Sequence, residues 1–202
     1  MASYTLQLYN ATGKGYTFCI YNEPPKSVAL KTVAWKCRWV PAAGEIPSSA
    51  SVDWTVDYGV AIRNFDQDGK NSTGLQIVNA ELGKAYEVIP GPTINPTPTP
   101  DKTVEHREIK FVNNSKQALE MGIAINCNII YTKSVENGES ILTDVHSKRY
   151  YIALYRNKSE GDAITSDIVA GPIDVAFNGA TKYKVTAEKC DGKVCLTKGL
   201  LK

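Results

Sequence analysis

The chain has 202 residues, a length that suits one β-sandwich or barrel, or at most two smaller domains. Its 23 lysines and arginines nearly balance its 21 aspartates and glutamates, so the net charge of +2 lacks the basic excess of a nucleic-acid-binding protein. The two histidines, His106 and His146, leave imidazole-based catalysis and zinc sites short of ligands. We therefore expect neither an enzyme nor a nucleic-acid-binding protein.

The first eight residues, MASYTLQL, lack the charged region and apolar stretch of a secretory signal. No run in the chain approaches the ~18 apolar residues that a membrane-spanning helix needs. These observations predict a cytoplasmic protein without a transmembrane segment.

Alternating apolar and polar residues predict β-strands from one end of the chain to the other. The longest alternating stretch, residues 52–62, is expected to form one strand with a single apolar face. A short helix is expected near residues 115–121. We predict an all-β protein, with one antiparallel β-sandwich domain over residues 1–202. Further strands are expected at residues 4–8, 16–20, 28–35, 74–79, 84–89, 106–112, 121–131, 140–145, 149–156, 163–170, 173–177, 182–188 and 193–197.

Aromatic residues gather in the first third of the chain, where all three tryptophans lie within residues 35–54. Aromatic rings bury large areas, so most of them are expected in the core. The segment from Trp35 to Trp39 differs, because it alternates large rings with the long cations Lys36 and Arg38. These rings could instead line a pocket for a flat apolar or sugar ligand, with the cations at its edge. The candidate ligand-binding residues are Trp35, Lys36, Arg38, Trp39, Trp54 and Tyr58.

Residues 64–72 carry oxygen-bearing side chains at alternating positions before Gly69, as a calcium loop does. An EF-hand would also need a glutamate at its twelfth position, where this chain has Leu75. A solvated hairpin turn is the alternative. If the loop binds Ca²⁺ or Mg²⁺, Asp66 and Asp68 are the expected ligands.

A proline-rich stretch, residues 90–102, lies near the middle of the chain. Its proline spacing favours extended polyproline II structure without ladder pairing, so we expect a surface crossover. On either side, residues 6–12 and 109–115 share an apolar strand that ends in an Asn-x-Thr/Ser turn. These segments indicate either two related halves joined by the crossover or two ordinary hairpins.

The five cysteines are an odd number, which fits a reducing compartment better than a disulfide framework. Cys190 and Cys195 form a special pair near the C-terminus. A turn at residues 192–193 would place them directly opposite each other, near disulfide reach. A turn at residues 191–192 would instead pair Cys190 with Lys193 and leave the two cysteines offset and unbridged.

Four segments carry a family resemblance: residues 21–26 (YNEPPK), 33–35 (VAW), 52–58 (VDWTVDY) and 179–186 (GATKYKVT). They resemble the RhiA-like, rhizosphere-expressed proteins of bacteria and fungi, best over the first 65 residues. The resemblance implies a small soluble β-sandwich without known catalysis, and it assigns no site. More weakly, the chain is similar to fruiting-body proteins of mushrooms, among them a pink chromoprotein that carries a polyene.

These observations favour a non-catalytic protein that holds a small hydrophobic molecule, such as a polyene pigment or a lipid, in an aromatic-lined pocket. The alternative is a fungal-type lectin or a membrane-binding defence protein that presents exposed aromatic residues. An enzyme is disfavoured, because no nucleophile, base or metal triad is assembled in the sequence. A monomer and a homodimer both remain open.

Overall fold

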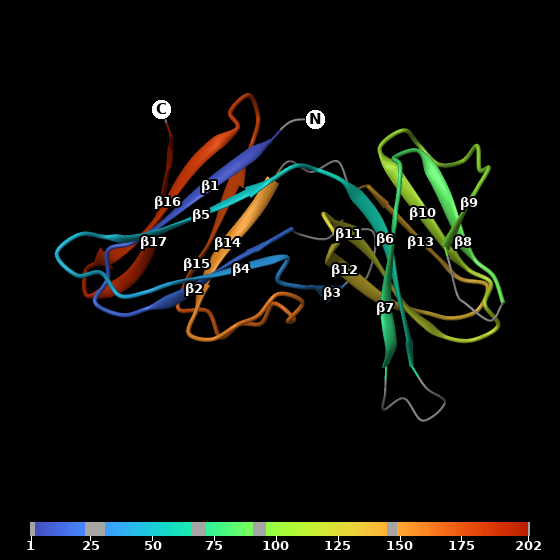
Figure 1. Cartoon of the computed structure of the whole chain (residues 1–202), viewed down its shortest axis with the longest axis horizontal. Coiled ribbons are helices and arrows are strands. Elements are labelled where there is room, and N and C mark those ends of the chain that lie inside the picture. Colours follow the sequence, from blue (N-terminus) through green and yellow to red (C-terminus); the bar gives the residue numbers. More distant parts are fainter. Residues whose placement is uncertain (1–2, 23–30, 66–71, 91–95, 145–148, 202) are drawn as a thin grey trace. The chain divides into compact units, whose positions relative to one another are not determined.

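The computed structural model describes residues 3–22, 31–65, 72–90, 96–144 and 149–201 (Figure 1). Every regular element in these ranges is a β-strand, so the all-β prediction is confirmed. None of the described residues forms a helix long and apolar enough to cross a membrane. The chain divides into two compact units, where the sequence led us to expect one sandwich domain.

Unit 1 comprises Met1–Glu23, Val33–Val56 and Lys148–Lys202. It contains two four-stranded sheets, whose apolar faces meet in a core rich in aromatic rings. In order across the first sheet, the strands are β17 (Lys193–Leu200), β16 (Lys182–Cys190), β1 (Tyr4–Asn10) and β5 (Ser48–Trp54). Across the second they are β15 (Ala170–Ala176), β14 (Arg149–Tyr155), β2 (Tyr16–Tyr21) and β4 (Lys36–Val40).

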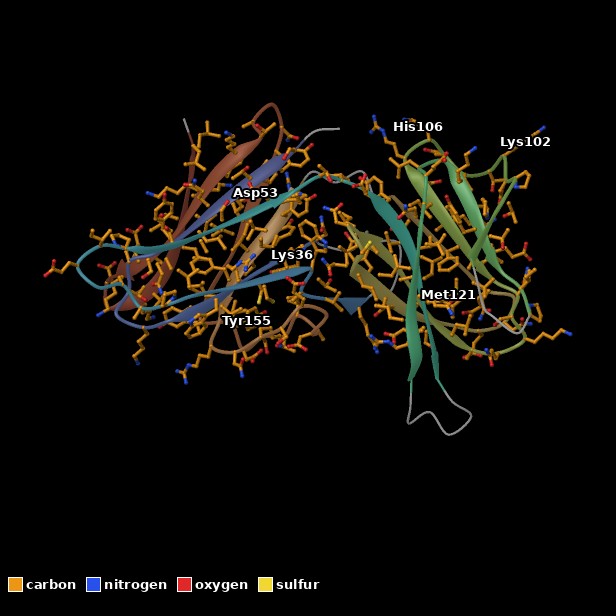
Figure 2. All side chains as sticks on the ribbon, in the orientation of Figure 1. Lys36, Asp53, Lys102, His106, Met121 and Tyr155 are labelled. Carbon is orange, nitrogen blue, oxygen red and sulfur yellow. A yellow bond between two sulfur atoms is a disulfide. The ribbon has the colours of Figure 1, made fainter. Side chains whose placement is uncertain are left out.

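Unit 2 comprises Pro24–Thr32 and Asp57–Ser147 and also contains two sheets. Its buried side chains, such as Met121 (Figure 2), are mostly aliphatic. One sheet has the order β13 (Ser140–Asp144), β10 (Glu108–Asn113), β8 (Lys84–Val88) and β9 (Pro96–Thr99). The other has the order β3 (Lys31–Thr32), β12 (Asn128–Val135), β11 (Leu119–Ile125), β6 (Tyr58–Phe65) and β7 (Ser72–Asn79).

The strand pairings of the two units follow one plan. All six pairings of unit 1 recur in unit 2 with the same parallel or antiparallel sense, and the two-residue β3 is an addition. For example, β1 runs parallel to β16, as β10 runs parallel to β8. With β3 set aside, unit 1 consists of the first and last groups of four strands, whereas unit 2 consists of the two middle groups. Each unit therefore joins the first four strands of one half of the chain to the last four of the other half.

A buried asparagine occupies the same place in both units. Asn10 ends β1, and its Oδ1 accepts hydrogen bonds from the backbone N and the hydroxyl of Thr12 at 2.9 and 2.7 Å. Asn113 ends β10 and accepts the matching bonds from Ser115 at 3.1 and 2.7 Å. This agreement favours related halves over two ordinary hairpins. The Nδ2 groups donate to backbone carbonyls, of Lys14, Val40 and Pro41 for Asn10 and of Gln117 and Val135 for Asn113.

The single strand expected over residues 52–62 is wrong, because the chain leaves regular structure at residues 55–57. Trp54 ends β5 in unit 1, and Tyr58 begins β6 in unit 2. The apolar–polar alternation of the sequence continues across the break, although only β5 buries alternate residues and β6 buries residues 59–62 in a row. Alternation alone could not locate the change of unit.

The prolines of residues 90–102 do not prevent pairing, contrary to our expectation. Residues 96–99 form β9, which pairs antiparallel with β8. Because β9 is an edge strand and its prolines occupy every second position, the missing N–H groups can all lie on the side away from β8.

Two further local predictions are wrong. The helix expected at residues 115–121 is replaced by bends and by the start of β11. The strand expected at residues 163–170 is mostly irregular, with one isolated bridge between Ala163 and Val33. In both places the strands on either side of the segment form their backbone hydrogen bonds with other strands of their sheets, so the segment between them stays irregular.

Candidate functional site

Trp35 and Trp54 lie in the core of unit 1. Their side chains are 0% and 4% exposed, and their ring centroids are 5.4 Å apart in an edge-to-face contact. Tyr150 stacks on Trp35 at 5.5 Å, and its hydroxyl accepts a hydrogen bond from Trp54 Nε1 at 3.3 Å. Phe177 packs against Trp54 at 5.3 Å. The rings fill this part of the core by packing on one another.

The other four predicted binding residues are spread over two units. Lys36 lies on β4 with its Nζ 5.8 Å from the centroid of Trp35 (Figure 2). Arg38 and Trp39 on the same strand are exposed, and Trp39 keeps 55% of its surface accessible. Tyr58 belongs to unit 2. The structure therefore does not gather the six residues into one pocket within a unit.

Trp39 packs against a glycine. A Cβ atom at Gly15 would lie 2.3 Å from Cζ2 of the Trp39 ring, so only glycine admits the ring in this position. The ring is thus held in place although it remains more than half exposed. The predicted metal ligands Asp66 and Asp68 lie outside the described residues, so their role stays a prediction.

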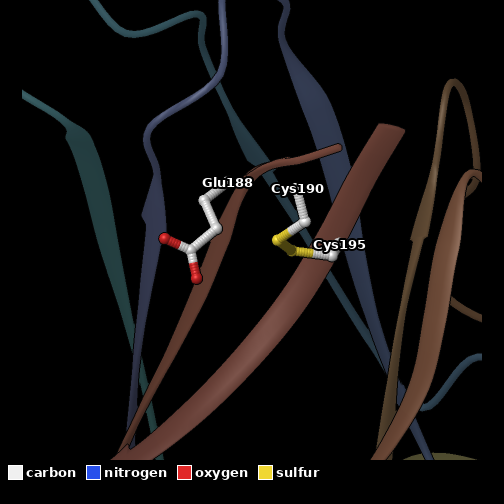
Figure 3. A group of neighbouring side chains, drawn as sticks. All are labelled: Glu188, Cys190 and Cys195. Carbon is white, nitrogen blue, oxygen red and sulfur yellow. A yellow bond between two sulfur atoms is a disulfide. The ribbon is translucent and has the colours of Figure 1, made fainter. Parts of the chain in front are cut away.

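The cysteine pair near the C-terminus is bridged (Figure 3). The hairpin turns at Asp191 and Gly192, both with positive φ, and Cys190 pairs with Lys193 as in our second alternative. Our inference that this register leaves the cysteines unbridged is wrong. The bond joins diagonal neighbours with Cα atoms 5.9 Å apart, which is within the usual disulfide range.

Glu188 lies beside this disulfide (Figure 3). Its carboxylate and the two sulfurs lie within 4.8 Å of one another, as in a metal-binding group. Thiolates are the metal-binding form of cysteine, and both sulfurs are used in the bridge. In the bridged state the cluster therefore offers a single carboxylate as a strong ligand.

A groove of about 720 Å³ lies in unit 2 at the end of the sheet that contains β8 and β9. One wall is the β7–β8 turn, and the other is the end of β9 with the segment that follows it. Apolar groups and charged side chains both line it. The lining residues are Val78, Asn79, Ala80, Glu81, Gly83, Lys84, Tyr86, Pro98, Thr99, Pro100, Asp101 and Lys102.

Both walls of this groove are anchored on β10. In the β7–β8 turn, the backbone N of Gly83 donates to the carbonyl of Glu108 at 2.7 Å. Gly83 has a φ of 76°, and a Cβ there would lie 3.3 Å from the Cα of His106, so this close approach favours glycine. On the other wall, Asp101 Oδ2 lies 2.7 Å from Lys110 Nζ. The groove is therefore preformed by contacts that need no ligand.

Charge in the groove is uneven. Hydrogen bonds from Lys110 and Thr103 hold the pKa of Asp101 well below its usual value, so this carboxylate stays charged and paired. Among the residues that the structure describes, Lys84 and Lys102 make no ion pair, and both are exposed. Because Lys110 neutralises Asp101, the remaining charges of the groove are those of Lys84, Lys102 and Glu81, which sum to one positive charge. The rim thus favours an anionic group.

A second groove, of about 470 Å³, lies in unit 1 between β14, β15 and β17. Its charged residues already bind one another. Lys198 Nζ lies 3.0 Å from Asp174 Oδ1, and Arg149 Nε lies 4.0 Å from Asp174 Oδ2. The hydrogen bond from Lys198 lowers the pKa of Asp174. This groove offers fewer unpaired charges to a ligand.

Sequence reasoning missed the groove of unit 2. Lys84 and Lys102 are separated by 17 positions, and pairing of β8 with β9 brings their segments together. Such proximity depends on the strand pairing of the proline-rich segment, which we had excluded. The predicted residues Trp35, Trp39, Trp54 and Tyr58 line neither groove.

A protein-family profile matches this chain. No curated protein and no solved structure matches the chain. The RhiA family profile matches residues 1–198, which is nearly the whole length, and this agrees with the resemblance seen in the sequence. The chain therefore belongs to the RhiA family.

Proposed function

We propose that the protein is a non-catalytic binding protein that holds a small molecule with an apolar body and an acidic group in the groove of unit 2. The observation that carries the proposal is the preformed groove of about 720 Å³, whose rim carries two lysines that make no ion pair with any residue that the structure describes. This volume lies in the range of ~300–1,000 Å³ that is typical of small-molecule sites. A polyene or fatty carboxylic acid combines the required features.

The lining chemistry supports binding rather than catalysis. Val78, Ala80, Pro98 and Pro100 offer apolar surface to a hydrocarbon body. Among the described residues that line the groove there is no cysteine, histidine or serine, the side chains most often used as nucleophiles or in nucleophile–base pairs. Tyr86 is 4% exposed, and its hydroxyl accepts a hydrogen bond from the backbone of Glu81, so it serves the turn.

Titration with cis-parinaric acid, a fluorescent polyene carboxylic acid, tests the proposal. We expect saturable binding by the full chain, and a Val78→Trp variant, which fills the groove, should abolish it. Replacing Lys84 or Lys102 by Gln should weaken binding up to about fivefold each, the size of an exposed ion pair. The Lys133→Gln variant, on β12 outside the groove, is the matched control and should bind as the wild type does.

Absence of saturable binding by the wild type would contradict the proposal. So would binding that persists unchanged in the Val78→Trp variant, because the ligand would then occupy another place. An absorption spectrum of the protein purified from its native source tests the pigment form of the proposal. A coloured preparation that releases a polyene on extraction is expected, and a colourless one without an extractable small molecule would exclude a pigment.

A further inference from the structure

Cys19 and Cys37 of unit 1 are free cysteines whose sulfur atoms lie 3.2 Å apart. They occupy directly opposite positions on β2 and β4, and β4 is the edge strand of its sheet. The backbone N of Cys37 donates outward to Glu160 Oε1 at 3.3 Å. The two residues therefore form a non-hydrogen-bonded pair of the antiparallel ladder, in which opposite side chains are closest.

The pair lies on the face of β2 away from the aromatic core. Every residue of β2 is buried, so both of its faces are covered. Cys19 belongs to a small buried cluster on this face with Tyr21, Ala34, Ala153 and Tyr155. Segment 156–169 supplies Ile164 and Ile168 to the edge of this cluster, and we call it the covering segment.

Backbone bonds fix the covering segment in place. The backbone N of Ala34 donates to the carbonyl of Asp162, and the backbone N of Gly161 donates to the carbonyl of Ala34, both at 2.8 Å. The hydroxyl of Tyr155 donates to the carbonyl of Thr165 at 3.0 Å (Figure 2). The Glu160 contact to Cys37 therefore joins a well-anchored segment to the cysteine pair.

The two thiols differ in their access to solvent. Cys19 is 0% exposed, whereas Cys37 is half-buried and reaches the surface. The hydrogen bond with Cys37 and burial raise the pKa of Cys19. Cys37 is thus the sulfur that can meet a reagent from solution first.

We propose that Cys19 and Cys37 form a reversible dithiol–disulfide couple, which a small soluble disulfide oxidises and which ties the edge strand β4 to β2. The Cys37 thiolate attacks one sulfur of the small disulfide, forming a mixed disulfide and releasing one small thiolate. The sulfur of Cys19 then attacks that of Cys37, and the proton of Cys19 passes to the second small thiolate as it leaves. Two protein thiols are oxidised by two electrons, and the small disulfide is reduced to two thiols.

The matching positions of unit 2 show that the fold does not require this pair. In the ladder between β11 and β12, the residues equivalent to Cys19 and Cys37 are Gly122 and Thr132. A Cβ at Gly122 would lie 2.4 Å from the carbonyl oxygen of Tyr131, so this site excludes any side chain. Two cysteines in contact are therefore particular to unit 1.

Oxidation of the folded full chain with glutathione disulfide, followed by non-reducing digestion and peptide mass mapping, tests the proposal. We expect a Cys19–Cys37 bridge whose fraction follows the ratio of glutathione disulfide to glutathione and which dithiothreitol reverses. In the Cys19→Ala variant, Cys37 should accumulate as the mixed disulfide with glutathione. In the Cys37→Ser variant, Cys19 should stay unmodified because it is buried.

The Cys127→Ser variant removes the third free cysteine, which is exposed on another unit, and should form the bridge as the wild type does. Hydrogen exchange provides a second readout, since bridging should slow exchange of the β4 amides. Wild-type protein that keeps both thiols free, or that stops at the mixed disulfide on Cys37, would overturn the proposal. The wild-type result alone decides, even if a variant fails to fold.

Discussion

At the scale of single residues, Asn10 and Asn113 show how one side chain can close a sandwich edge. Each amide bonds both to the turn that follows its own strand and to a carbonyl elsewhere in its unit. Both side chains are fully buried, so removing either would leave backbone groups without partners. The sequence showed the Asn-x-Thr/Ser motif in both places. These hydrogen bonds were needed to favour related halves over two ordinary hairpins.

Substitution of either asparagine should therefore be costly. We expect Asn10→Ala and Asn113→Ala each to lower the free energy of unfolding of their own unit by about 3 kcal/mol, as loss of a buried hydrogen-bond network does. Urea unfolding measures the change. Asn79→Ala, at an exposed position of β7, is the control and should stay within about 0.5 kcal/mol of the wild type. A similarly small effect of Asn10→Ala or Asn113→Ala would refute the network's importance.

At the scale of elements, most strands could be predicted because alternation reports burial of one face. The failures have physical causes. Residues 52–62 cross between units without losing their alternation, and residues 163–169 cover a sheet face with one isolated bridge, at Ala163. The proline-rich strand β9 was missed because we took proline to exclude all strand pairing. Proline excludes a central position in a sheet, but it is tolerated in an edge strand such as β9. The candidate groove was lost with it, since β9 forms one of its walls.

The prolines of β9 should also protect its exposed edge. An edge strand with free N–H groups can pair with another molecule, and proline removes these groups. We expect Pro98→Thr, at an exposed position of β9, to increase self-association relative to the wild type in sedimentation velocity. The Pro41→Thr variant, at an exposed position after β4, is a control for the loss of one proline. Equal sedimentation of Pro98→Thr and wild type would contradict the protective role.

At the scale of the whole molecule, the two units repeat one plan of strand pairing, and each unit takes its strands from both halves of the chain. With β3 set aside, each unit takes four strands from each half, so residues far apart in sequence fold together. Composition and alternation carry no information about such an exchange, because both halves contain similar strands. The repeated motif at residues 6–12 and 109–115 was the one signal of duplication in the sequence.

Hydrogen exchange can verify this division. In Asn10→Ala, protection should fall in β14 to β17, more than 130 residues away, as well as in β1, β2, β4 and β5. Protection in β6 to β13 should remain as in the wild type. Asn113→Ala should give the opposite pattern. Loss of protection confined to the mutated half, residues 1–100 for Asn10→Ala, would contradict the exchange of strands between halves.

The proposed function is tested most directly by hydrogen exchange of the wild-type chain with and without saturating cis-parinaric acid. Binding in the groove of unit 2 should slow exchange in residues 78–86 and 97–102, with no change in β14, β15 and β17 around the groove of unit 1. Protection at the groove of unit 1, or no protection at all, would contradict the account.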